Sequence, residues 1–163
     1  LFEVRESIIK KLEDIFATSH RQNMFSCFEQ RIHDKISSSR LSAPELCEIY
    51  AQGLKDMFGD SVKIPKEYHW EWATIPHMLD VPFYVYSYNF GNLLVLGLYQ
   101  LYLDEGQAFI PKLKRILSAG SSKSPVQLMR DEGIDILSSD FWQGSIAYIE
   151  SILDELQLTI SMD

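Results

Sequence analysis

The sequence predicts an all-α protein, and three observations lead to this class. Apolar side chains recur every three or four residues over most of the 163-residue chain, a spacing that places them on one face of a helix. Residues typical of helix starts and ends separate these periodic segments. No stretch of strand length alternates convincingly between apolar and polar side chains. Because the intervening loop signals are short and no repeat is present, we expect one compact, multi-helical unit.

The first helix is expected over residues 4–36. Its apolar side chains are interrupted by six polar residues at 18–23, which either form a solvated stretch or line a polar cleft. No capping residue precedes Val4, so the chain begins inside a helical pattern. This start indicates a piece of a longer protein, with a trimmed disordered end as the alternative.

A second helix is expected from Ser42 to Phe58. Ser42 and Glu45 have the spacing of a capping box, in which each side chain binds a free backbone N–H of the first turn. Pro44 is tolerated in that first turn, and Gly59 supplies a typical helix end.

Residues 68–77 form an unusually aromatic segment after a polar connector. This segment holds two Trp, one Tyr and two His within ten residues. We expect one or two helical turns that end near Pro76, because the residue before a proline avoids the α region.

Residues 81–103 contain no charged side chain and are long enough to cross a bilayer. They carry a polar load that is costly in hydrocarbon, and the mean hydropathy of the whole chain is only -0.09. We therefore expect a central helix that is buried on nearly all sides and has one end in a wet cavity, and we expect no membrane partner.

Three further helices are expected in the last third of the chain. One covers residues 107–118, where Pro111 is acceptable only in the first turn. A short helix follows Ser124 as its cap and ends at Gly133. The last helix opens at residues 138–140.

The composition limits the partners and the compartment. The 23 acidic and 15 basic side chains give a formal net charge of -8, which argues against a nucleic acid partner. Cys27 and Cys47 cannot build a disulfide framework and are expected to be buried free thiols, as suits the cytoplasm. No metal-binding motif is present: the four His lack ligand spacing, so we expect no metal bound by this chain.

One cluster of residues indicates chemistry, namely His77 with Tyr84, Tyr86 and Tyr88. Tyrosine hydroxyls are neutral donors, and donors fixed at the start of a helix can stabilise a developing oxyanion. In a regular helix Tyr84 and Tyr88 share a face, whereas Tyr86 points elsewhere. The alternative is a set of buried aromatic rings whose hydroxyls bind the backbone.

The chain resembles the C-terminal catalytic segment of the oligoendopeptidase F family, zinc metallopeptidases related to thimet oligopeptidase. The segments that carry the resemblance are Glu-Trp-Ala-Thr-Ile-Pro-His at 71–77, Pro-Phe-Tyr-Val-Tyr-Ser-Tyr-Asn-Phe-Gly at 82–91, and the flanking residues 21–29, 117–122 and 133–135. Together they cover nearly the whole chain in the family's order. Met78 and Leu79 depart from the aromatic residue expected soon after the family's His.

The resemblance implies a zinc ion held by a His-Glu-x-x-His helix and a downstream Glu, both upstream of residue 1. It implies that His77 and the tyrosines Tyr84, Tyr86 and Tyr88 bind an oligopeptide substrate and stabilise the oxyanion. Residues 1–163 would then be the C-terminal helical part of a larger catalytic domain, inactive alone and without its own zinc.

Two functions follow as hypotheses. The first is the C-terminal segment of a zinc metalloendopeptidase, whose partner is the upstream half of its own chain. We expect an open surface where that half packs, which self-association of the fragment could cover. The second is a non-catalytic helical module that binds extended, preferably basic peptides.

Overall fold

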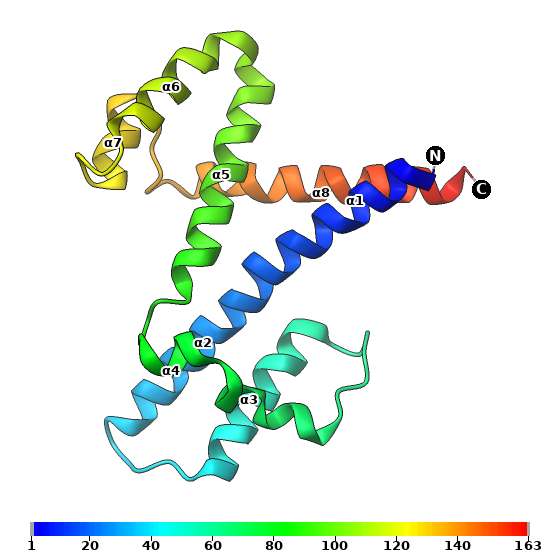
Figure 1. Cartoon of the computed structure of the whole chain (residues 1–163), viewed down its shortest axis with the longest axis vertical. Helices are drawn as coiled ribbons and strands as arrows, with labels where there is room; N and C mark the ends of the chain where they lie inside the picture. Colours follow the sequence, from blue (N-terminus) through cyan, green and yellow to red (C-terminus); the bar gives the residue numbers. More distant parts are fainter. Residues whose placement is uncertain (1, 163) are drawn as a thin grey trace. The chain divides into compact units, whose positions relative to one another are not determined.

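The computed structural model describes residues 2–162, and throughout this range the chain is all-α, with helices joined by turns (Figure 1). Its α-helices, in chain order, are α1 (Phe2–Ile15), α2 (Arg21–Ile36), α3 (Ala43–Phe58), α4 (Pro76–Asp80), α5 (Tyr86–Glu105), α6 (Ile110–Ala119), α7 (Pro125–Asp131) and α8 (Ser139–Ser161). No helix among these residues has the length and apolar character needed to cross a bilayer. The predicted fold class is confirmed.

The chain divides into two compact units rather than the single unit expected from the sequence. Unit 1 comprises Leu1–Glu13 with Gly91–Asp163, and unit 2 comprises Asp14–Phe90. Both boundaries fall inside helices, within α1 and within α5. The expectation of one unit was wrong because helical periodicity continues across these boundaries while the packing partners change.

Local capping chemistry fixes several helix ends as predicted. The backbone N–H of Ser42 donates to Oε2 of Glu45 at 2.8 Å, which completes the capping box of α3. Gly59 ends that helix with a φ of 55°. This is a left-handed conformation that glycine adopts readily and that would be strained for a residue with a side chain. The hydroxyls of Ser124 and Ser138 accept backbone N–H groups at the starts of α7 and α8.

The long first helix is interrupted by a π-helical turn at Phe16–His20, between α1 and α2. This turn overlaps the polar stretch 18–23, where the sequence showed a break in the apolar stripe. A π turn shifts the helix face by one residue, so the stripe resumes on α2 in a new register.

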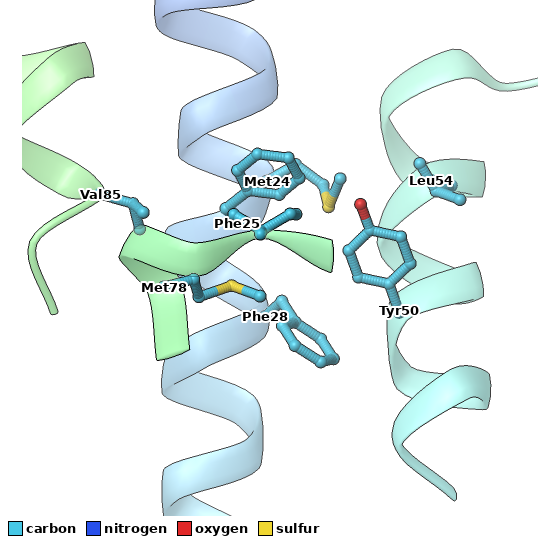
Figure 2. Packing of buried hydrophobic residues seen from close by; sticks show 8 residues of the cluster. Met24, Phe25, Phe28, Tyr50, Leu54, Met78 and Val85 are labelled. Carbon is cyan, nitrogen blue, oxygen red and sulfur yellow. The ribbon is translucent and has the colours of Figure 1, made fainter. Parts of the chain in front are cut away.

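The core of unit 2 lies between α2 and α3 (Figure 2). Phe25 and Phe28 extend from α2 toward Tyr50 on α3, and the Phe28 and Tyr50 rings meet edge-on with centroids 5.2 Å apart. Met78 of α4 and Val85, which precedes α5, complete this cluster. The core therefore anchors two positions inside the segment 77–88, which carries the candidate site residues.

In unit 1 helices α5 and α8 pack closely. The hydroxyl of Ser145 on α8 donates to the carbonyl of Leu93 on α5 at 2.8 Å. Gly97 lets the helices approach, because a Cβ placed there would lie 2.6 Å from the Phe141 ring.

Helix α5 differs from the expected central helix buried on nearly all sides. Within it Leu96, Gly97 and Leu98 are buried, whereas Val95 is 61% and Leu103 52% exposed. The uncharged run at 81–103 led to an expectation of too much burial. Unit 1 covers only some of the apolar side chains of α5, and the others remain exposed.

Candidate functional site

His77 sits in the first turn of α4, and the local sequence explains why. A 3-10 helix over Lys66–Thr74 ends as expected before the proline, and Ile75 is extended. Pro76 then starts α4 rather than only ending the preceding turns, because its fixed φ suits the first helical position. The second residue of α4, His77, is thereby half-buried in unit 2.

Two neighbours fix the orientation of the His77 imidazole. Its Nε2 lies 3.5 Å from the side-chain oxygen of Gln22, which belongs to α2. Its ring meets the ring of Tyr88 edge-on, with centroids 5.7 Å apart. The imidazole is therefore held between α2 and the first turn of α5.

The three tyrosines surround the start of α5. Tyr84 precedes the helix, Tyr86 is its first residue, and Tyr88 lies half a turn further. The rings of Tyr84 and Tyr88 meet at 85° with centroids 5.5 Å apart, so these two come together as expected, although Tyr84 lies in the turn before the helix and not on it. All three side chains are exposed, which excludes the alternative of a buried aromatic cluster.

The structure thus brings together three of the four residues singled out from the sequence. His77, Tyr88 and Tyr84 form a continuous chain of ring contacts, the His/Tyr cluster. Tyr86 is 58% exposed and, within residues 2–162, belongs to none of these ring contacts. Helical geometry accounts for this separation, because a residue two positions away projects about 200° around the helix axis.

The turn before α5 depends on a residue that the sequence reasoning missed. The backbone N–H of Phe83 donates to Oε1 of Glu29 at 2.9 Å. Glu29 lies on α2 and is only 1% exposed. The available signal was its place four residues after Phe25, on the apolar face of the helix, where a carboxylate needs a partner.

A second polar network fastens the aromatic segment to α2 and α3. The carboxylate of Glu71 forms an ion pair with the Arg21 guanidinium. Its Oε2 also accepts a hydrogen bond from the Tyr50 hydroxyl, at an O–O distance of 2.7 Å. Burial raises the pKa of Tyr50 well above its usual range, and the hydrogen bond to Glu71 adds to the effect. Tyr50 is therefore a fixed neutral donor that holds the 3-10 helix in place.

A pocket of about 590 Å³ opens beside this network in unit 2. Arg21, Glu71 and Tyr68 supply its polar lining, and the other lining residues are mostly apolar, namely Leu54, Met57, Phe58, Val62, Lys63, Ile64 and Pro65. Its size and lining resemble those of sites that take a side chain or a small ligand.

The described residues do not supply a zinc site. Among residues 2–162, no three His, Cys, Asp or Glu side chains gather where they could hold a metal ion. Zinc in proteins needs at least three such ligands. Cys47 is buried and Cys27 half-buried, and both are free thiols.

Comparison with known proteins places these residues in context. The sequence model of peptidase family M3 matches residues 3–148. Oligopeptidase PepF of Bacillus subtilis (strain 168) is 34% identical over 147 residues, which are 90% of this chain and 22% of that protein. An oligoendopeptidase F homolog of Borreliella burgdorferi is 30% identical over 150 residues, or 91% of this chain and 25% of that protein.

A solved structure agrees with these sequence comparisons. The crystal structure of a Chlamydophila abortus protein assigned as a peptidase matches with a TM-score of 0.83 and 27% identity. The match covers 91% of this chain and 25% of that chain. The chain thus spans about a quarter of the length of the relatives it matches.

Proposed function

Since the chain belongs to peptidase family M3, we propose that it is the C-terminal segment of a zinc-dependent endopeptidase that cleaves oligopeptides. The chain covers about a quarter of its relatives, so the other parts of the enzyme lie outside these 163 residues. The observation that carries the proposal is the His/Tyr cluster, because it presents two exposed tyrosines and the half-buried His77 as donors on a fixed frame. The two free thiols support a cytoplasmic location.

The His/Tyr cluster suits a reaction that develops negative charge on a peptide carbonyl oxygen. Hydroxyl and imidazole N–H groups donate to such an oxyanion, and donors held in place beforehand need no reorganisation during the reaction. Ring contacts hold His77, Tyr84 and Tyr88 in this way. Tyr86 projects separately and is proposed to bind the substrate from another side.

The metal of the proposed enzyme would be held by residues outside this chain. Zinc would supply Lewis-acid chemistry at the carbonyl when bound. The part played by residues 2–162 is to bind and orient the peptide and to donate hydrogen bonds. We accordingly propose that the isolated chain is inactive and holds less than one equivalent of zinc.

Assays of the intact protein test this proposal. The protein, purified with its full complement of zinc, is given a mixture of oligopeptides, and cleavage products are identified by mass spectrometry. We expect cleavage that stops with a chelator and returns with zinc. Absence of any cleavage by the zinc-loaded protein would overturn the proposal.

A peptide-binding module without catalysis is the second candidate, and the pocket of about 590 Å³ favours it. The net charge of -8 would then select basic peptides. Titration of the isolated chain with a labelled basic peptide separates the two functions. Tight binding that His77→Ala leaves unchanged, with no cleavage by the intact protein, would support the module.

A further inference from the structure

We propose that Glu29 is a positioning residue of this active site, because its buried carboxylate holds the backbone turn that aims the tyrosines. The inference rests on the proposed function and adds a residue to it. The proposed link is the hydrogen bond from the Phe83 N–H to Oε1 of Glu29, which joins positions 54 residues apart.

Phe83 adopts a backbone conformation that needs support. Its φ is 62°, and within residues 2–162 it is the one non-glycine residue with a positive φ. Bulky side chains are rare in this region, and such residues persist where their surroundings hold them. The hydrogen bond to Glu29 and the His33 ring, whose centroid lies 4.5 Å from that of Phe83, provide this support.

The position of Phe83 connects this conformation to the candidate site. Phe83 immediately precedes Tyr84, and Val85 after it is fully buried in the core of unit 2. Because the core fixes Val85, a change of φ at Phe83 would be taken up at Tyr84, the residue between them, and would redirect its ring. The conformation at Phe83 therefore sets where the Tyr84 ring points, and with it the contact between Tyr84 and Tyr88.

The buried carboxylate of Glu29 is not explained by a contribution to folding stability alone. Burying a carboxylate is costly unless hydrogen bonds compensate, and Glu29 is 1% exposed. Its Oε1 accepts one hydrogen bond, whereas its Oε2 is buried without a partner among the described residues. Phe25 and Phe28 occupy the same helix face with apolar side chains, so the acceptor at position 29 indicates a specific role for it.

Helix α2 supports both sides of the His/Tyr cluster. Gln22 contacts the imidazole of His77, and Glu29 holds the turn before Tyr84. These two residues lie seven positions apart, or two helical turns, and so project from one face. A single rigid helix thereby fixes the His and the tyrosines relative to each other.

The test compares Glu29→Gln with Glu29→Met in the intact enzyme. The Gln variant keeps an oxygen that can accept the Phe83 N–H, whereas the Met variant has a similar volume and no acceptor. For Glu29→Met we expect a kcat roughly 10- to 100-fold lower, with KM and zinc content nearly unchanged. We expect Glu29→Gln to retain most of the activity.

A double variant tests whether Glu29 affects kcat through the backbone conformation of Phe83. Glycine adopts a positive φ without strain, so Phe83→Gly should reduce the loss caused by Glu29→Met. Hydrogen exchange at residues 81–85 gives a readout that does not depend on catalysis. Exchange there should rise in Glu29→Met and stay near the wild-type level in Glu29→Gln.

The outcomes separate the two claims. If the wild-type enzyme cleaves peptides while Glu29→Met keeps its kcat, the role of Glu29 is overturned and the proposed function stands. Equal losses in the Gln and Met variants, with equal falls in melting temperature, would show a merely structural residue and also overturn it. A zinc-loaded wild type that cleaves nothing overturns the proposed function and, with it, any catalytic part for Glu29.

Discussion

The imidazole of His77 and the phenol ring of Tyr88 meet edge-on, with their centroids 5.7 Å apart. They lie eleven positions apart in the chain, with a tight turn between them. Their contact is possible because the core of unit 2 fixes Met78 and Val85, one on each side of that turn. The contact holds the half-buried His77 and the exposed Tyr88, both hydrogen-bonding groups, at one place, and it is the basis for the proposed chemistry.

The close approach of α5 and α8 predicts opposite effects at two glycines of α5. Gly97→Ala should destabilise the protein by about 1–3 kcal/mol, since the added Cβ would lie 2.6 Å from Phe141 and 2.7 Å from the Ser145 hydroxyl. Gly91→Ala has open space and should stabilise it by about 0.5–1 kcal/mol. Urea unfolding of both variants measures the effects, and equal midpoints would contradict this packing.

The hydrogen bond from Tyr50 to Glu71 predicts a cost for removing one hydroxyl. Tyr50→Phe leaves an oxygen of Glu71 without its donor, so we expect a loss of about 1–3 kcal/mol in the free energy of unfolding. Tyr68→Phe is the matched control, because Tyr68 is 55% exposed, and it should be nearly neutral. Thermal or urea unfolding measures the stability of both variants. Similar stabilities would count against the hydrogen bond between Tyr50 and Glu71.

The pair between Arg115 and Glu132 in unit 1 predicts a pH-dependent contribution to stability. The guanidinium donates to both carboxylate oxygens, with Nη2 2.6 Å from Oε2, and lowers the pKa of Glu132 below its ordinary 4.5. A lowered folded-state pKa stabilises the protein above the unfolded-state value, and this stabilisation is lost as the pH falls through the folded-state pKa.

Melting temperatures of an Arg115→Gln variant measure this effect. The variant should melt below the wild type near neutral pH, and the difference should shrink as the pH is lowered through the acid range. Lys114→Gln changes the same net charge at a neighbouring exposed position and should show little such trend. A deficit for Arg115→Gln that stays constant down to acid pH would contradict the pairing.

Local signals in the sequence predicted much of the fold. The capping box at Ser42 and the helix end at Gly59 depend on residues within one turn of each other, so their spacing was sufficient. The contact between Glu29 and Phe83 spans 54 residues and leaves no local pattern apart from a charge on an apolar face. The exposure of α5 likewise depends on which neighbours are present, which periodicity does not encode.

In the candidate site, too, the sequence predicted local relationships and missed the contacts between distant residues. The sequence paired Tyr84 with Tyr88, and their rings do meet, but Tyr84 reaches Tyr88 from the turn before α5 and not from the same helix face. It did not show that Gln22 contacts His77, nor that Pro76 would begin a helix as well as end one. These arrangements depend on tertiary packing around α2.

The most direct test of the central claim is the kcat of His77→Ala and Tyr88→Phe in the intact protein loaded with zinc, because these two residues form the contact at the centre of the His/Tyr cluster. The loss of one oxyanion donor lowers kcat by roughly 10²- to 10³-fold in other enzymes, and we expect a fall of that order with zinc content unchanged. Tyr102→Phe, a tyrosine further along α5, is the control and should keep the wild-type rate. An unchanged kcat in both His77→Ala and Tyr88→Phe would contradict the role assigned to this site.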